Sequence, residues 1–301
     1  MTSAGDPAVS KTAARPDGGG RRLPLPWLGV VPFLLYLGLF LLLPTAIIAF
    51  GSFTTKQGSP TLNNIAGINQ DFLIKAFVTS TTISVASALL GAIFGAMLAY
   101  AVATGNPRGV LRRVVTSMSG VLAQFGGVTL AFAFIATIGN IGFVTLFLQS
   151  HGIDIYANGA PLYQVSGLIV VYTYFQIPLM LLVFLPAVDG IRPQWREATE
   201  SLGGSTWHYW RYVAGPLLAP SFLGCTLLLF ANAFSAYATA ANLITQGGII
   251  VPLQIQNLFT SETGRSQPGL AKALALSMIL IVTIVVVLYT LLQRRTSRWL
   301  R

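Results

Sequence analysis

The sequence has very few charged residues. Only 9% of its 301 residues are Asp, Glu, Lys or Arg, and just 8 of them are acidic. Soluble globular domains carry about 25% charged residues, so the composition excludes an ordinary soluble protein. Because 54% of the residues are hydrophobic and the mean hydropathy is +0.70, we predict a membrane protein.

The residues that most often build reactive centres are also scarce. The single cysteine, Cys225, lies in an apolar run, which excludes a disulfide within the chain and favours a small buried thiol. The two histidines, His151 and His208, are expected at opposite membrane faces. No Ser-His-Asp or Cys-His arrangement, metal-spaced cluster or Walker A loop is present. We therefore expect no catalysis, no metal site and no ATP hydrolysis in this chain.

The net charge of +10 does not indicate a nucleic-acid partner. The basic residues sit in short runs between apolar segments, without the interleaved aromatic residues of a nucleic-acid surface. Residues 1–26 are rich in Gly, Ala, Pro and Ser and have no apolar period, so we predict a disordered cytoplasmic tail.

The predicted fold is an all-α membrane protein with six transmembrane helices. A span needs about 20 mainly apolar residues, and the run from Trp27 to Phe50 is too long for the apolar region of a signal peptide. The third span is the least defined, because apolar character continues from Gly139 to Leu148, which could form a re-entrant or interfacial segment. The predicted spans are residues 27–51, 73–104, 114–138, 162–187, 216–241 and 269–293.

The distribution of basic residues predicts the orientation. An even number of spans places both termini on one side, and cytoplasmic loops are enriched in Lys and Arg. With both termini cytoplasmic, 14 of the 18 basic residues lie inside: Lys11, Arg15, Arg21, Arg22, Arg108, Arg112, Arg113, Arg192, Arg196, Arg211, Arg294, Arg295, Arg298 and Arg301. The other four are Lys56, Lys75, Arg265 and Lys272.

The most polar interior stretch, REATESLGGSTWHYWR, lies at residues 196–211, between the fourth and fifth predicted spans. Pro193 suits the first turn of a helix over about residues 194–202. Gly203 and Gly204 should end that helix, and Ser205 or Thr206 can cap a second short helix leading to the fifth span. Composition alone favours an ordinary interfacial loop, with Trp and Tyr at headgroup level.

The spacing favours a functional loop instead. Glu197, Ala198 and Thr199 are followed by Gly203 six residues after the Glu and by Pro216 nineteen residues after it. This register resembles the EAA loop of permease subunits in ATP-binding-cassette (ABC) importers, whose pattern is E-A-A-x-x-x-G, nine residues, then I-x-L-P.

Three positions depart from that pattern. Thr199 replaces the second Ala, Val213 replaces Ile and Gly215 replaces Leu, and the last change leaves the entry to the fifth span looser than usual. The resemblance covers about residues 70–295.

The resemblance implies a type I importer fold: a MetI-like permease core at about 70–295 within a transmembrane domain at 27–301, in the bacterial inner membrane. It implies pairing with a second permease subunit, with a heterodimer expected, together with two ATPase subunits that bind ATP and Mg²⁺, and an extracytoplasmic substrate-binding protein. The loop at 193–216 would be the coupling helix. Its expected contacts with the ATPase are Glu197, Ala198, Thr199, Leu202, Gly203, Gly204, Trp207 and Pro216.

Polar residues inside the spans are candidates for the translocation pathway, because they usually face the bundle interior or a water-filled path. Asn232, Ser235 and Thr239 recur at helical spacing in the fifth span, and Tyr237 lies close by. With Gln124, the residues Asn232, Ser235 and Tyr237 are predicted to line the pathway, although an interhelical hydrogen bond is the more common role for any one of them.

Acidic residues are absent from the predicted spans. The spans therefore lack a proton relay, which argues against an ion-coupled secondary transporter. An intramembrane enzyme is also disfavoured, since Cys225 alone is a poor nucleophile candidate.

Residues 230–240 look most like the spermidine/putrescine branch of the permeases, with the aminoethylphosphonate branch next. This resemblance implies a small polar substrate such as a polyamine or aminophosphonate. A sugar, iron, thiamine or oxyanion permease is the alternative.

Overall fold

The structure is a computed structural model that describes residues 25–55, 57–106, 109–157, 159–244, 249–260 and 267–297. It divides into two units, Met1–Ile47 and Ile48–Arg301. Nearly all of the predicted tail lies outside the described residues.

The described residues form helices joined by turns, with one isolated β-bridge between Thr54 and Pro60. The all-α prediction is therefore confirmed. Six helical stretches are long and apolar enough to cross a membrane, as predicted: Val30–Ser52, Asp71–Thr104, Gly127–Ser150, Val165–Asp189, Thr206–Ser235 and Pro268–Leu291.

The first stretch contains a local change of helix type. It consists of α1 (Leu25–Leu37), the π-helical η1 (Gly38–Leu42) and α2 (Leu43–Ser52). The π turn precedes Pro44, which has no N–H for an α-helical hydrogen bond, and the wider turn accommodates the proline.

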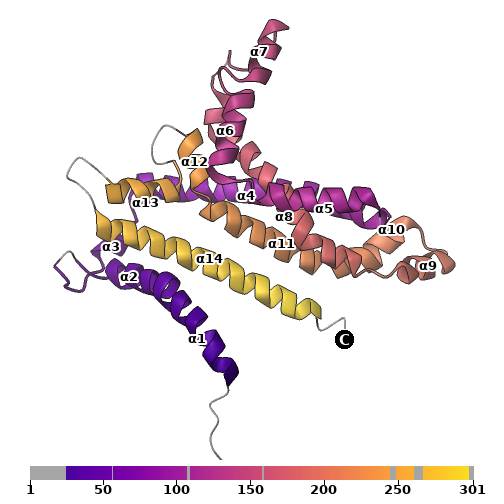
Figure 1. Cartoon of the computed structure of the whole chain (residues 1–301), viewed down its shortest axis with the longest axis horizontal. Helices are drawn as coiled ribbons and strands as arrows, with labels where there is room; N and C mark the ends of the chain where they lie inside the picture. The colour runs from indigo at the N-terminus through magenta and orange to yellow at the C-terminus, as the bar shows by residue number, and fades with distance from the viewer. Residues whose placement is uncertain are drawn as a thin grey trace, which may run out of the picture. The chain divides into compact units, whose positions relative to one another are not determined.

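The core of the second unit is built around α4 (Asp71–Thr104) and α8 (Val165–Asp189) (Figure 1). Gly91 and Gly95 bring the two helices together. A Cβ on Gly91 would lie 2.4 Å from the Cβ of Gln176, and one on Gly95 would lie 2.5 Å from the Cβ of Met180. Small residues at this spacing allow backbones to approach closely.

Further helices surround this pair. α11 (Gly215–Ser235) packs on α4, α8 and α14 (Pro268–Ser297), and α13 (Val251–Thr260) packs on α4 and α14. The short α3 (Asn63–Ala66) also contacts α14. α11 thus joins the α4–α8 pair to α14.

The predicted third span, 114–138, is wrong. α5 (Val110–Gln124) is a separate helix that packs on α8. A new helix, α6 (Gly127–Ile138), begins at Gly127, whose φ of +68° is a left-handed conformation that glycine adopts at little cost. The third membrane-length stretch therefore begins at Gly127, whereas the predicted span began at residue 114.

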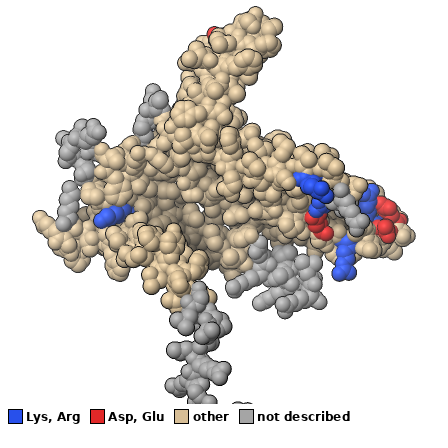
Figure 2. Space-filling view, viewed as in Figure 1, with Lys and Arg blue, Asp and Glu red and all other residues tan. Residues whose placement is uncertain are grey.

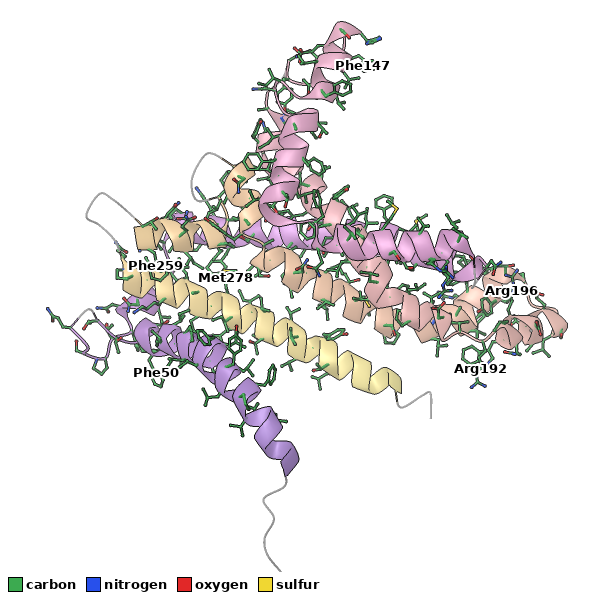
Figure 3. The ribbon with its side chains drawn as sticks, viewed as in Figure 1. Phe50, Phe147, Arg192, Arg196, Phe259 and Met278 are labelled. Atoms are coloured by element: carbon green, nitrogen blue, oxygen red, sulfur yellow. The ribbon has the colours of Figure 1, made fainter. Side chains whose placement is uncertain are left out.

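The membrane-length stretch continues beyond residue 138. After α6, the chain turns and forms α7 (Phe143–Ser150). Together they project away from the bundle of α4, α8 and α11 (Figure 1), and Phe147 lies near the tip of the projection (Figure 3). The apolar continuation noted in the sequence is therefore part of the third stretch.

The predicted fifth span, 216–241, is also wrong at both ends. The helical stretch begins at Thr206 and ends at Ser235, and α12 (Ala238–Leu243) is a separate short helix. The hydroxyl of Tyr172 on α8 donates to the carbonyl of Ala236 at 2.7 Å, which satisfies a carbonyl exposed by the break.

Charged side chains gather at the end of the molecule that carries α9 and α10 (Figure 2). Figure 3 places Arg192 and Arg196 there. Lys75 and Lys272 lie instead near the first turns of α4 and α14. Arg108, Lys56, Arg265 and the side chains of the C-terminal arginines lie outside the described residues.

Candidate functional site

The loop between α8 and α11 begins with the predicted helix. α9 (Pro193–Ser201) starts at Pro193, and Gly203 follows its end with a φ of +78°. The N–H of Gly203 donates to the carbonyl of Glu200 at 3.0 Å, and the N–H of Gly204 donates to the carbonyl of Thr199 at 2.9 Å. These bonds satisfy carbonyls of the last helical turn and reverse the chain.

The two adjacent glycines serve different purposes. A Cβ on Gly203 would meet nothing within 4 Å, so this position requires glycine for its backbone conformation. A Cβ on Gly204 would lie 2.7 Å from the Cγ2 of Thr199. Gly204 therefore allows the chain after the turn to pack closely against Thr199 on α9, the residue that replaces the second Ala of the motif.

The second helix begins at α10 (Thr206–Tyr209), and Ser205 precedes it. The Ser205 hydroxyl lies 2.9 Å from Nδ1 of His208, and both groups take part in a capping box. This confirms the predicted cap. The helix is not short, however, because it continues through η3 (Trp210–Ala214) into α11.

The π-helical turn explains this continuity. Pro216, at the start of α11, cannot donate a backbone hydrogen bond, and its ring would crowd the preceding α-helical turn. The wider turn bonds the N–H of Gly215 to the carbonyl of Trp210 and carries the helix past the proline. α10, η3 and α11 therefore form one continuous helical stretch.

One face of the loop is anchored to the bundle. Tyr209 is buried, and Trp210 packs edge-on against Tyr100 near the end of α4, with ring centroids 5.2 Å apart. Arg112 on α5 forms an ion pair of 2.5 Å with Asp189, the last residue of α8. Sequence reasoning missed this pair, although opposite charges at the ends of neighbouring helices were a signal for it.

The other face of the loop presents apolar side chains. Leu202 is 89% exposed and Trp207 is 71% exposed. Tyr212, which the sequence analysis did not select, is 72% exposed. Its ring stacks on that of His208, one helical turn earlier, with ring centroids 6.1 Å apart, and this four-residue spacing was the available sequence signal. We call Leu202, Trp207 and Tyr212 the apolar patch.

Glu197 is exposed on α9, and no described residue hydrogen-bonds or pairs with its carboxylate. Its neighbour Glu200 accepts a hydrogen bond of 3.0 Å from Arg196, and this bond raises the pKa of the guanidinium above its ordinary value. The two acids of α9 thus differ, because Glu200 has an internal partner and Glu197 has none in the described structure. Ala198 is exposed beside it.

The predicted pathway residues lie near two helix breaks. Gln124 is exposed at the end of α5. Asn232 and Ser235 are exposed in the last turn of α11, and Tyr237, in the following break, hydrogen-bonds the side-chain oxygen of Gln256 on α13. The structure therefore groups Asn232, Ser235 and Tyr237.

The predicted polar stripe does not extend to Thr239. That residue belongs to α12, is buried, and donates to the carbonyl of Gly127 at 3.2 Å. The bond holds α12 against the start of α6, three residues after Gln124 in the sequence.

Gln176 is fully buried between helices. Its Nε2 donates to the carbonyl of Leu229 on α11 at 2.8 Å, and its Oε1 has no hydrogen-bond partner among the described residues. This amide links α8 to α11, as expected for interhelical hydrogen bonding.

Residues 156–298 match the family described as the inner membrane component of binding-protein-dependent transport systems. The match covers 143 of the 301 residues and identifies this segment as similar to that permease family. The matched segment includes α8, the loop with α9 and α10, and the helices that follow. The EAA-like register and the bent helices at 193–216 thus lie within the part that defines the family.

Relatives and solved structures extend the similarity to almost the whole chain. A sulfate transport system permease of Synechococcus elongatus is 26% identical, covering 92% of this chain and 91% of that protein. A trehalose permease of Mycobacterium tuberculosis is 25% identical, covering 80% and 82%. A chain of a bacterial alginate ABC transporter shares the fold, with a TM-score of 0.67 at 17% identity, covering 91% and 95%.

The chain is therefore a permease subunit of an ABC importer. Its relatives are named for sulfate, trehalose, thiamine and molybdenum transport. The comparisons together consequently support the role of a permease subunit and leave the substrate open.

Proposed function

We propose that this permease forms half of a translocation pathway and that its 193–216 loop couples the pathway to a separate ATPase. The observation that carries the proposal is the two-sided construction of the loop. The apolar patch and the unpaired Glu197 face outward, whereas Tyr209 and Trp210 hold the opposite side on the bundle. Rigid aromatic side chains that fill a pocket are typical anchors of protein interfaces.

The mechanism follows from the continuity of the helix. When two ATPase subunits close on bound ATP and Mg²⁺, the displaced loop would move α10, and η3 would transmit the movement into α11. Asn232 and Ser235 lie at the far end of α11 and face away from the subunit's own core. A push on the loop would thus reposition residues of the proposed pathway.

Further chains complete the proposed assembly. A second permease subunit would close the pathway over the exposed Asn232 and Ser235, and we expect a heterodimer. An extracytoplasmic binding protein would deliver the substrate, as indicated for the related alginate transporter, whose structure was determined in complex with an alginate-bound periplasmic protein.

The proposed substrate is a small polar solute, with a polyamine or an aminophosphonate as the first candidate. An oxyanion is the second candidate, because the similarity to the sulfate permease covers 92% of this chain. Uptake of labelled spermidine, aminoethylphosphonate and sulfate into cells expressing the complete transporter distinguishes them. ATP-independent, ion-driven transport by the isolated chain in liposomes would instead support a secondary transporter.

The proposed orientation places the 193–216 loop and both termini in the cytoplasm of a bacterial cell. Reporter fusions at Ser205 should give a cytoplasmic signal and fusions at Asp154 an extracytoplasmic one, because the basic residues concentrate at the Ser205 end. A cytoplasmic signal at Asp154 would contradict the six-span topology.

The coupling role is tested by reversing the charge of Glu197. We expect Glu197→Lys to abolish uptake and weaken retention of the ATPase during purification, while membrane insertion is unchanged because the residue lies outside the spans. Glu200→Lys is the matched control, since it has the same charge on the same helix and loses only an exposed pair worth about 0.3–0.5 kcal/mol. Normal uptake by Glu197→Lys, or equal loss in both variants, would refute a specific role for Glu197.

A further inference from the structure

A polar pocket lies at the end of the second unit opposite the 193–216 loop. It encloses about 470 Å³ between the end of α2, α3 and the first turn of α14. Asn63, Gln70 and Gln267 contribute side-chain amides, and among the described residues Lys272 is the only charged one that lines it. None of the residues assigned to coupling or to the pathway takes part.

Two glycines allow the pocket to form. A Cβ on Gly51 would lie 2.5 Å from Cδ of Lys272, so the lysine side chain lies across the backbone of α2. A Cβ on Gly269 would lie 2.5 Å from Oδ1 of Asn64. The Nδ2 of Asn64 donates to the carbonyls of Ser52 and Thr54 at 3.2 and 3.0 Å, which fixes this amide in place.

The electrostatic environment of Lys272 is unbalanced. The lysine lies near the start of a 30-residue helix, where the helix dipole contributes further positive potential. No carboxylate of the described residues lines the pocket, and none of them pairs with Lys272. Asp71, in the first turn of α4, is exposed and outside the lining. The positive charge in this pocket therefore lacks a described counter-charge.

We propose that this pocket binds a phosphate group, with Lys272 as its counter-ion. Lysine is a common point-charge partner of phosphate, and the surrounding amides can donate to the remaining phosphate oxygens. A volume of about 470 Å³ exceeds the needs of one small ion and falls in the usual range for small-molecule sites. The phosphate can therefore come from a lipid headgroup or from a soluble phosphate.

The experiment uses the full-length chain, purified in detergent and depleted of anionic lipid. Inorganic phosphate is titrated at constant ionic strength while thermal unfolding is followed. In parallel, retention of added phosphatidylglycerol is compared with that of phosphatidylcholine by native mass spectrometry. We expect Lys272→Gln to weaken binding about tenfold or more, because a charge-assisted hydrogen bond is lost, and Lys272→Arg to retain it.

Lys75→Gln is the matched control, because Lys75 is an exposed lysine on the first turns of α4 and does not line the pocket. Stabilisation by inorganic phosphate would identify a soluble ligand, and selective retention of phosphatidylglycerol alone would identify a headgroup. No response to either probe, or equal losses in Lys272→Gln and Lys75→Gln, would overturn the proposal. Since only binding is measured, the result is independent of the coupling mechanism.

Discussion

The conformation of Gly203 provides the most direct test of how the loop is built. Its φ is +78°, and a Cβ would meet nothing within 4 Å. Replacement by valine therefore introduces no clash with another residue and acts through the backbone. A left-handed conformation costs an L-residue about 1–2 kcal/mol, which corresponds to a change of about 5- to 30-fold in the population of the native turn.

We expect Gly203→Val to lower ATPase retention and substrate uptake by a factor in this range. The measurements are co-purification of the ATPase and initial uptake rates at matched expression. Gly203→Asn should remain near wild type, because asparagine adopts the left-handed region more readily than other residues with side chains. This pair of variants separates the backbone conformation from the mere loss of glycine.

A second control separates local from global effects. Gly152, in the connection between α7 and α8, has a φ of +81° and also has no neighbour within 4 Å of a built Cβ. Gly152→Val should carry the same backbone cost without affecting ATPase retention. Wild-type behaviour of Gly203→Val would show that the turn does not determine coupling, and equal losses at Gly152 would attribute the effect to general destabilisation.

Three further predictions concern the bundle. Gly91→Leu should lower the melting temperature of the purified permease, because overpacking costs about 1–3 kcal/mol; an unchanged melting temperature would contradict the close contact. Tyr172→Phe removes the hydrogen bond to Ala236 and should cost about 0.6–2 kcal/mol in the same assay; no change would show that the bond does not stabilise the break. Asn232→Cys, made in a Cys225→Ala background, should react with a water-soluble thiol reagent at a rate that depends on the nucleotide state, and a thiol inert in every state would exclude it from the pathway.

The local structure of the loop could be predicted because it depends on neighbouring residues. Pro193 starts the first helix, Gly203 ends it, and Ser205 caps the next, each through bonds or conformations within a few residues. The number of spans was likewise predictable, since each apolar run is long enough to cross a membrane. Neither inference required knowledge of tertiary contacts.

The helix breaks could not be predicted in the same way. The sequence from residue 230 to 240 contains no charged residue, proline or glycine, so a continuous span was the natural expectation. The chain nevertheless breaks after Ser235, where the hydroxyl of Tyr172, 64 positions away, satisfies the carbonyl of Ala236. The compensation comes from another helix, and its partner cannot be identified from local sequence.

The break after α11 matters for transport because its partners lie on other helices. The buried Thr239 on α12 donates to the carbonyl of Gly127, so the segment that follows α11 is tied to the start of α6. Non-helical backbone at membrane depth is tolerated where it is buried in protein or lines a water-filled cavity. The exposed Asn232 and Ser235 precede this break on the helix that begins in the proposed coupling loop. Movement of the loop would therefore act on the end of α11, which leads directly into a backbone break held by other helices.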